Sequence, residues 1–538
     1  MSASSKKKLR NAEQAEKMTE KQLAEQKEAK KLKLYTTLAV VIMIALVAFA
    51  AYTGISKTVT GSGIRERNTV ALTIGDNEIS NAELNYYFID AVNTFYNQYG
   101  AYAALLGLDV TKPLDEQFIS GEENLTWAED FLKSAIENVK ATYALNNEAK
   151  ANGVTLPEAS VTSIDTALKT MEVYATAYGY PNVRTYLKAM YGNGATEQGL
   201  RNFYEMTELA RYYQSQYQES LTYTDDQLRA AEAENFNKYS SYTYNYYYLN
   251  IYNFIEGDTD ASAEYTAEQK AAAAKKTEEA AKALMDGVKT VEEFDEAIAA
   301  LPFNAENAAA ASYASKNASY GSIFSGYADW MTDPSRKAGD MTYVASTSTD
   351  AEGNETINGY YVAMFGSCND NNYALVNVRH ILVGFEGGSY NSTTGATTYT
   401  DEEKAAAKAE AEAILTEWKA GAATEDSFAA LANEKSDDGD GTTGGLYENV
   451  YPGQMVDGFE NWCFDGRKVG DTGVVETEYG YHVMFYSGDS ETTNRDRLIS
   501  NELATIDYNT WYTDLVNAVT VEENNIKYIN TGLVLNNA

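Results

Sequence analysis

The feature that most constrains the fold is an internal repeat, because residues 244–366 and 376–487 carry the same sequence signals in the same order. YNYYYLNIYNF near the start of the first copy aligns with VNVRHILVGFE in the second, and GYYVAMF near its end aligns with GYHVMFY. Between these strand-like segments, each copy has a long helix that opens with a capping box, at Thr266 and at Thr400. The repeat predicts two domains of one fold, each a small antiparallel sheet covered by helices.

Histidine occurs only in the second copy. His380 and His482 are the only two histidines among 538 residues, and each lies in a short apolar, strand-like run. In the alignment, Tyr248 and Tyr361 take their places in the first copy. A strand histidine is more often a core residue than a catalytic one, so residue type alone leaves both interpretations open. The fold is expected to form without the pair, because the first copy lacks it.

The N-terminal region has the charge pattern of a membrane anchor. Residues 34–55 form an uncharged run long enough to cross a hydrocarbon layer of ~30 Å as a helix. The arm 1–33 holds ten Lys and Arg against five Glu, a net charge of about +5. The whole chain has a net charge of −36, so the residues after the arm carry about −41. The positive-inside tendency predicts a transmembrane helix with a cytoplasmic arm and with residues 56–538 outside the cytoplasm. A cleaved signal peptide is the alternative, since AFA at 48–50 resembles a cleavage site.

Composition excludes several classes of site. The acidic balance argues against a nucleic-acid groove, which needs clustered Lys and Arg. Cys368 and Cys463 cannot form a disulfide framework; two buried small side chains are favoured, with a single bridge as the alternative. DDGDG lacks the closing Glu of a calcium loop, two histidines are too few ligands for zinc, and the Gly run lacks the Lys of a phosphate loop. We expect no metal and no cofactor.

The segments outside the repeat read mainly as helix. TVALTIGDNEIS at 69–80 predicts a hairpin, and Ser80 with Glu83 opens a helix after it. Aromatic residues and Leu then recur at helical spacing to about residue 223, and Thr224 with Gln227 opens one more helix. The C-terminal segment has a helical stretch followed by strand-like IKYINTGLVL, and we expect it to return to the helical module. The predicted parts are an arm, a membrane helix, a helical module, two repeat copies and a C-terminal segment, at 1–33, 34–55, 65–240, 241–370, 374–487 and 488–538.

The second copy also contains motifs of a known family. RHILV, SDDGDGTTGG, PGQMVDGFENWCF and VGDTGVVETEYGYHV, in this order, resemble a parvulin-type peptidyl-prolyl cis/trans isomerase domain over about residues 374–487. The wider order of parts, with VALTIGDNEISNAELNYYF in the helical module, resembles the SurA and PrsA foldases. The resemblance implies an α+β fold. It places a helical chaperone module like the N-terminal part of SurA before two tandem parvulin-like domains, and one transmembrane helix before them all.

The resemblance implies a role for each matched position. His380 and His482 match two facing histidines on adjacent central strands, Asp438 matches a position that is cysteine or aspartate, and Thr477 matches the threonine before the final strand. The substrate proline would be held by four further residues, Leu446, Gln454, Met455 and Phe459. Two departures bear on the shape of this pocket: the usual Gly-Asp-Leu-Gly reads GGLY, and YENVYP is one residue longer than common.

The implied function is that of a membrane-anchored extracytoplasmic foldase. It would isomerise X-Pro bonds in unfolded or partly folded exported polypeptides and hold these clients, with an inactive first copy. The members of this family that recognise phosphorylated substrates have a basic cluster after the first strand. GFEGGSY stands there in this chain, so phosphorylated substrates are not expected. The 43 tyrosines would either contact clients or fill cores. The alternative is a non-catalytic membrane-anchored chaperone or surface adaptor that uses both copies as binding scaffolds.

Overall fold

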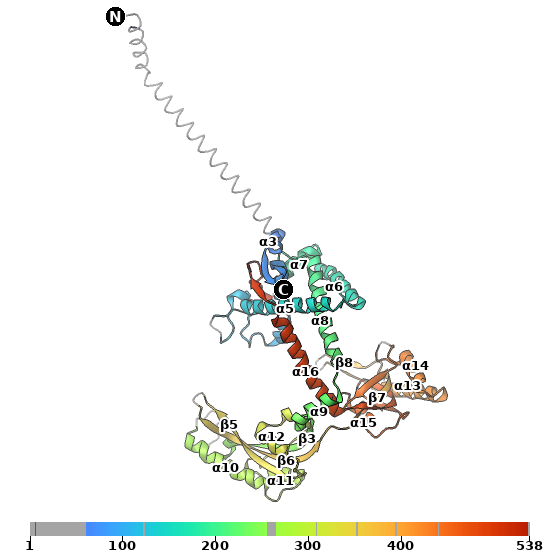
Figure 1. Cartoon of the computed structure of the whole chain (residues 1–538). Helices are drawn as coiled ribbons and strands as arrows, with labels where there is room; N and C mark the ends of the chain where they lie inside the picture. The colour runs from blue at the N-terminus through green and yellow to red at the C-terminus, as the bar shows by residue number, and fades with distance from the viewer. Residues whose placement is uncertain are drawn as a thin grey trace. The chain divides into compact units, whose positions relative to one another are not determined.

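The computed structural model describes Lys6 and residues 61–121, 124–255, 265–307, 309–350, 353–392, 395–439 and 441–535. The chain combines α-helices with small antiparallel sheets and divides into two compact units, Met1–Leu221 with Asp507–Ala538, and Thr222–Ile506 (Figure 1). The predicted membrane segment 34–55 lies outside the described residues, as does the arm 1–33 apart from Lys6. Within the described ranges, no helix is both long and apolar enough to cross a bilayer.

The first unit is mainly helical. Its helices are α3 (Ile64–Asn68), α4 (Asn81–Tyr99), α5 (Trp127–Ala151), α6 (Glu158–Ala177), α7 (Val183–Tyr191) and α8 (Glu197–Ser220). They accompany a three-stranded sheet in the order β13-β1-β2, formed by Val521–Glu523, Val70–Ile74 and Asn77–Ser80. The strand from the C-terminal segment therefore completes the N-terminal hairpin.

The strand predicted across IKYINTGLVL is wrong. Residues 526–535 contain no strand, and Ile526, Ile529 and Leu533 pack on the helical core instead. The backbone N–H groups of residues 527 and 528 donate to the side-chain oxygen of Asn81, and that of residue 530 donates to Asn85. Helix side chains thus supply the partners that a neighbouring strand would have supplied, and the segment remains irregular.

The helices begin at the predicted caps. The Ser80 hydroxyl accepts a hydrogen bond from the backbone N–H of Glu83 at the start of α4. Full capping boxes open α9 (Asp225–Glu234) at Thr224, α10 (Ala267–Met285) at Thr266 and α13 (Asp401–Ala420) at Thr400. The caps satisfy N–H groups that have no partner within the helix, which is why these sequence signals locate the helix starts.

Two four-stranded antiparallel sheets make up most of the second unit. The first has the order β4-β3-β6-β5, with strands Tyr313–Ser319, Ser241–Asn250, Glu355–Asn369 and Met341–Thr349. The second has the order β10-β7-β12-β11, with strands Leu446–Val450, Ala374–Gly384, Gly480–Thr493 and Thr472–Glu476. The other elements are α11 (Val291–Ala299), α12 (Ser325–Met331), α14 (Glu425–Lys435), α15 (Asp457–Cys463), β8 (Ser389–Asn391) and β9 (Ala396–Thr398).

The two sheets share an irregularity as well as a strand order. In each, the long central strand has one extra residue that is left unpaired at the same place, Gly366 in β6 opposite β3 and Ser487 in β12 opposite β7. The residue that pairs next to this bulge is Tyr244 in β3 and Val378 in β7. The bulges therefore align β3 with β7 by register, independently of sequence.

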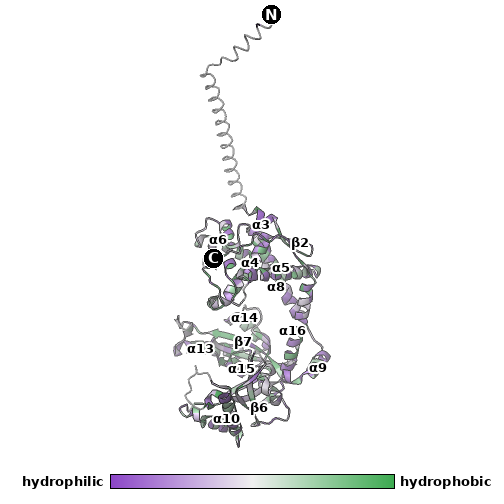
Figure 2. Ribbon diagram, turned by 90° about the vertical axis from the view of Figure 1, so that its left-hand side faces the viewer, coloured by the Kyte–Doolittle hydropathy of each residue, from purple (hydrophilic) through white to green (hydrophobic). Residues whose placement is uncertain are grey.

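The second sheet has a different core on each face. Ile381 and Val483 pack with Phe428 beneath α13 and α14, whereas Val378 and Met484 lie on the face that carries α15. Figure 2 shows β7 largely in the green of hydrophobic residues. Both faces of β7 and β12 are covered, so polar side chains on these strands need partners inside the domain.

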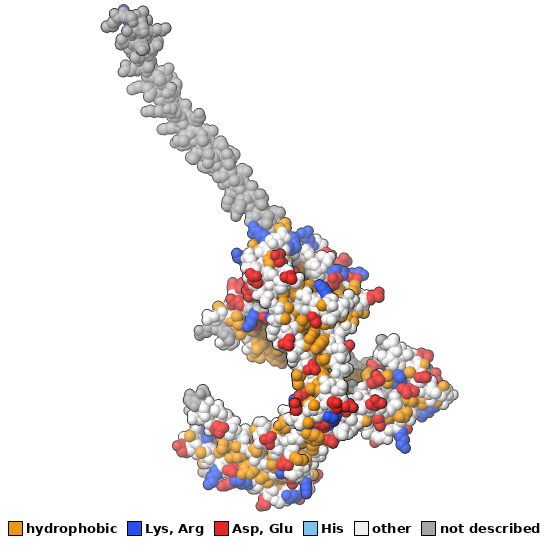
Figure 3. Space-filling model, viewed as in Figure 1, with side chains coloured by type: hydrophobic (Ala, Val, Ile, Leu, Met, Phe, Trp, Pro, Cys, Tyr) orange, Lys and Arg blue, Asp and Glu red, His pale blue; other side chains and the backbone are white. Residues whose placement is uncertain are grey.

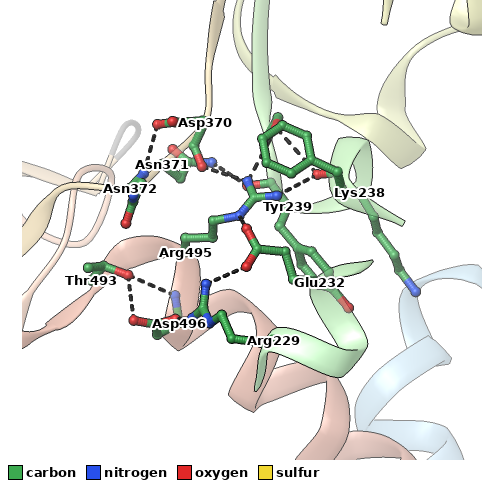
Figure 4. Close-up of polar contacts among 12 residues, drawn as sticks. Arg229, Glu232, Lys238, Tyr239, Asp370, Asn371, Asn372, Thr493, Arg495 and Asp496 are labelled. Carbon is green, nitrogen blue, oxygen red and sulfur yellow. Dashed lines mark hydrogen bonds and ion pairs between the residues drawn. The ribbon is translucent and has the colours of Figure 1, made fainter. Parts of the chain in front are cut away.

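A buried arginine links the segments that lead into and out of the sheets (Figure 4). Arg495, in the first turn of α16 (Asn494–Asn517), is 1% exposed and forms an ion pair with Glu232 of α9. Its Nη1 donates to the Asp370 carbonyl at 2.7 Å, and its Nη2 donates to the Phe236 carbonyl at 2.8 Å. Phe236 precedes β3 and Asp370 follows β6, so one side chain connects both ends of the first sheet to the helix that follows the second.

Candidate active site

The two histidines meet on the central strands of the second sheet. β7 and β12 pair antiparallel, with His482 opposite Leu382 and His380 opposite Met484. Alternate strand residues share a face, so both imidazoles point to the side that carries α15. Their Nδ1 atoms lie 3.0 Å apart, and the side chains of His380 and His482 are almost fully buried.

The histidines form the middle of a four-membered polar chain. His380 Nε2 lies 3.1 Å from Asp438 Oδ2, and His482 Nε2 lies 2.9 Å from Thr477 Oγ1. Thr477 is held at the turn before β12, where its backbone N–H donates to the Gly480 carbonyl. The contacts run from the Asp438 carboxylate through both rings to a hydroxyl, and the sequence-predicted residues His380, Asp438, His482 and Thr477 are all brought together.

The ends of this chain fix one order of protons. A carboxylate only accepts, so His380 donates to Asp438 from Nε2. In a neutral imidazole the other nitrogen then accepts, so His482 donates from Nδ1 to His380 Nδ1 and accepts at Nε2 from the Thr477 hydroxyl. In this order every ring nitrogen has a partner while both imidazoles are neutral.

Burial keeps the two imidazoles neutral. Desolvation lowers the pKa of His380, and the nearby Asp438 carboxylate only partly opposes it. Desolvation, followed by the charge that His380 would carry, lowers the pKa of His482 to about 4. At neutral pH the pair is therefore a hydrogen-bond network rather than a pair of cations.

A pocket opens beside the histidines. It has a volume of about 350 Å³ and is lined by His380, Leu382, Asp438, Tyr447, Gln454, Met455, Val456, Phe459, Tyr479 and His482. Phe459 is 2% exposed and stands edge-on to both imidazoles, with ring centroids at 5.3 Å and 5.4 Å. An apolar floor next to a polar chain suits a small apolar ring attached to an amide.

Of the four predicted proline-contacting residues, three line this pocket. They are Gln454, Met455 and Phe459, and the Gln454 side chain also accepts from the backbone N–H of Tyr451. The prediction that Leu446 completes the pocket is wrong. Leu446 pairs with Arg379 of β7, so it lies on the opposite face from His380.

Sequence reasoning missed Tyr447 and Tyr479. Tyr447 is the residue after Leu446, so it faces the pocket, and it holds the last position of the GGLY departure. That departure could have identified it. Tyr479 lies in the turn before β12, is 61% exposed and borders the opening.

The first sheet places tyrosines at the matching positions, but not quite as the sequence alignment predicted. Because the bulges align Tyr244 with Val378, the residue that corresponds to His380 is Tyr246 and not Tyr248. Tyr361 corresponds to His482, since each pairs with a valine of the edge strand, Val344 or Val475. The shift of two residues keeps the same face of the strand.

Similar solved structures cover different shares of the chain. The PPIase domain of TbPar42 is 25% identical over 21% of this chain and 98% of its own, with a TM-score of 0.17. A structure of the SurA-like chaperones PEB4 and Cj1289 of Campylobacter jejuni is 27% identical over 28% of this chain, with a TM-score of 0.16. PrsA from Bacillus subtilis is 14% identical over 73% of this chain and 87% of its own, with a TM-score of 0.26.

The chain spans 56% of the length of the SurA-like structure. A search of curated proteins found none that matches this chain. Residues 360–486, from the middle of β6 to β12, match the family model described as the PPIC-type PPIase domain. The chain therefore carries a peptidyl-prolyl cis/trans isomerase domain of the parvulin type.

Proposed function

We propose that residues 374–487 isomerise X-Pro bonds in unfolded or partly folded exported polypeptides, with His380, Asp438, His482 and Thr477 as the catalytic group. The observation that carries this proposal is the unbroken polar chain from Asp438 to Thr477 beside the apolar pocket. Met455 and Phe459 would seat the proline ring, and Gln454 would border it.

The chemistry needs no covalent step. Amide resonance sets a barrier of ~18–20 kcal/mol to rotation, and the twisted amide has lost that resonance. A pocket that seats the proline ring and leaves the carbonyl poorly solvated favours the twisted state over either planar state. Lowering the barrier by ~5 kcal/mol raises the rate by about 10³ to 10⁴. The neutral, fully paired histidines would set the polarity of this pocket and hold Asp438 in place.

A proline-limited refolding assay tests this role. The purified full-length protein is expected to accelerate the slow phase, and His380→Ala and His482→Ala are each expected to reduce kcat/KM about 100-fold, within the range of general catalytic groups. Tyr246→Phe in the first sheet is the matched control and should act like the unsubstituted protein. Equal acceleration by all four proteins would remove the histidines from the mechanism.

Residues 241–370 are proposed to be a second parvulin-like domain without isomerase activity. The shared strand order and the shared bulge support common ancestry of the two sheets. The apolar floor also has a counterpart, because Ile323, Phe324 and Tyr327 of the α12 region pack together as the α15 region does. Tyr246 and Tyr361 replace the imidazoles, so the fold is copied without the site.

The helical module is proposed to hold clients. Several apolar side chains after α4 and before α5 are largely exposed, with Leu105 at 83%, Tyr102 at 60% and Phe118 at 57%. Acidic side chains are scattered over the visible surface of both units (Figure 3), which would favour neutral or basic clients. The double variant Leu105→Ser, Phe118→Ser should lose suppression of client aggregation, whereas Val173→Ser, at a 64% exposed site on α6, should not.

The same holding activity without isomerisation is the second candidate function, a non-catalytic chaperone or surface adaptor. Suppressed aggregation together with an unchanged refolding phase would select it.

We further propose that residues 34–55 anchor the chain in the cell membrane with the bulk outside the cytoplasm. Alkaline extraction of membranes should then leave the full-length chain in the membrane fraction, and its release would contradict the anchor.

A further inference from the structure

We propose that Tyr447 is a positioning residue of the isomerase site, whose hydroxyl holds the Asp438 carboxylate against His380. This inference rests on the function proposed above and adds a residue to it. The phenol donates to Asp438 Oδ2 at 3.0 Å, and the same oxygen lies 3.1 Å from His380 Nε2. One carboxylate oxygen is thus shared by a tyrosine and a histidine.

The register of β10 puts Tyr447 in this place. Tyr447 pairs with Val378 of β7, so its side chain lies on the face that carries α15 and the histidines. Its ring centroid is 5.0 Å from that of His380 at an interplanar angle of 32°, and it meets Phe459 edge-on at 6.1 Å. The ring is packed on two members of the site while its hydroxyl reaches the rim, where Asp438 lies.

The loop that carries Asp438 is anchored before this residue, whereas glycines follow it. Gly439 and Gly441, which follow it closely, have φ angles of 82° and 73°, a conformation that glycine adopts far more readily than other residues. The preceding residue, Asp437, is anchored to β7 by accepting from the backbone N–H of Gly384 at 2.8 Å. The Asp438 side chain is 40% exposed, and among the described residues His380 and Tyr447 are the donors that reach its Oδ2, so both help to orient it.

The position of the carboxylate decides the tautomer of His380. With Asp438 at Nε2, the proton of a neutral His380 stays on Nε2, and the order of donors through His482 to Thr477 follows. If the carboxylate turns to solvent, the proton can occupy Nδ1 instead, and the order of the chain is no longer fixed. Tyr447 would therefore act on the imidazoles through Asp438.

The first sheet lacks this arrangement. Register alignment puts Ser315 of β4 at the position of Tyr447, because Ser315 pairs with Tyr244 as Tyr447 pairs with Val378. The tyrosine therefore occurs in the copy that holds the histidines, and a serine side chain is too short to span the same distance.

The experiment uses the fact that the full chain has only two histidines, so the imidazole ¹⁵N spectrum contains signals from two residues. In the unsubstituted protein we expect His380 protonated at Nε2 and His482 at Nδ1. Tyr447→Phe keeps the ring and removes the hydroxyl, and it should convert the His380 signals to those of mixed tautomers. Tyr390→Phe, at a 70% exposed site on β8, is the control and should leave the spectrum unchanged.

Kinetics supply the second readout. Tyr447→Phe should lower kcat/KM about three- to tenfold, the effect of one partly exposed hydrogen bond. In an Asp438→Ala background the same change should have no further effect, because the group it positions is gone. Additive losses, or an unchanged spectrum together with an unchanged rate, would overturn the proposal. A changed spectrum in a protein that never isomerises X-Pro bonds would overturn the proposed function and leave the positioning role standing.

Discussion

The two sheets of the second unit share a strand order and a bulge but differ in the side chains on one face of their central strands. In the second sheet, His380 and His482 join a polar chain next to an open pocket. In the first, Tyr246 and Tyr361 take the same places, with ring centroids 6.2 Å apart. The same backbone arrangement therefore forms with or without the site, which depends on a few side chains and their order.

The tyrosines of the first sheet pack where the second sheet keeps a hollow. The Tyr361 ring lies 4.6 Å from Phe324 and 4.7 Å from Tyr248, and the Tyr246 ring lies 5.6 Å from Tyr313. Aromatic contacts of this kind stabilise a core by about 0.5–1.5 kcal/mol each beyond area burial. The first sheet thus has aromatic packing at the positions where the second has a site.

The largest predicted effect concerns the junction that both sheets share. Arg495→Ala leaves Glu232 without its buried partner and removes the hydrogen bonds to Asp370 and Phe236, so it should lower the free energy of unfolding by about 3–5 kcal/mol. Urea denaturation measures this change. The ¹⁵N signals of the two histidines should stay where they are, since Arg495 contacts connectors and not the site. Altered histidine signals would show that the sheets are coupled, against the comparison above.

The next effect is a pH dependence that comes from the histidines, which only the second sheet has. The pKa of His482 is about 4 in the fold and 6.5 in the unfolded chain, so the unfolded state binds more protons between these values. The stability is therefore present in full above pH 6.5 and is lost as the pH falls toward 4, by roughly 3 kcal/mol.

The double variant His380→Tyr, His482→Tyr makes the second sheet resemble the first and isolates this term. Its loss of stability between pH 7.5 and pH 4.5 should be smaller than that of the unsubstituted protein, because it lacks the two imidazoles. Some loss should remain, because carboxylates titrate in both proteins. Urea denaturation at the two pH values gives the difference. Equal losses would mean that the imidazoles are not kept neutral by the fold.

The local signals in the sequence predicted much of this comparison. The caps at Ser80, Thr224, Thr266 and Thr400 located helix starts, since capping depends on neighbours within three residues. The histidine pair followed from motifs at both strands. The sequence alignment places the equivalent of His380 at Tyr248, two residues from its position at Tyr246. Tyrosines alternate along β3, so a shift of two residues presents the same pattern.

What depends on distant segments could not be read from the sequence. Arg495 contacts residues more than a hundred positions away, and nothing near it marks it as buried. Tyr447 faces the pocket in place of Leu446, because β10 follows a glycine-rich loop whose sequence does not fix which residue of the strand faces inward. The sequence of residues 526–535 predicts a strand, although side chains of α4 accept from the backbone N–H groups of residues 527 and 530.

A matched pair of core substitutions should separate stability from activity. Phe459 on α15 and Tyr327 on α12 are equivalent by position, with exposures of 2% and 3%. Changing either to Leu should cost about 1–2 kcal/mol of unfolding free energy, because each leaves a partly filled core. Only Phe459→Leu should slow isomerisation, about tenfold, since Phe459 lines the pocket and stands against both imidazoles. Equal rate losses in both variants would place a catalytic contribution in the first sheet.

The smallest expected effect comes from moving the histidines alone. In a protein that carries His380→Ala, adding Tyr246→His and Tyr361→His gives the first sheet an imidazole pair on the correct face. We expect the residual rate in the refolding assay to stay unchanged. Aromatic rings would surround the new imidazoles, because Phe324, Tyr313 and Tyr248 pack around positions 246 and 361. The native pair is instead ordered by hydrogen bonds to Asp438 and Thr477. Recovery of activity would show that two histidines suffice and that the order of the four groups is not what separates the sheets.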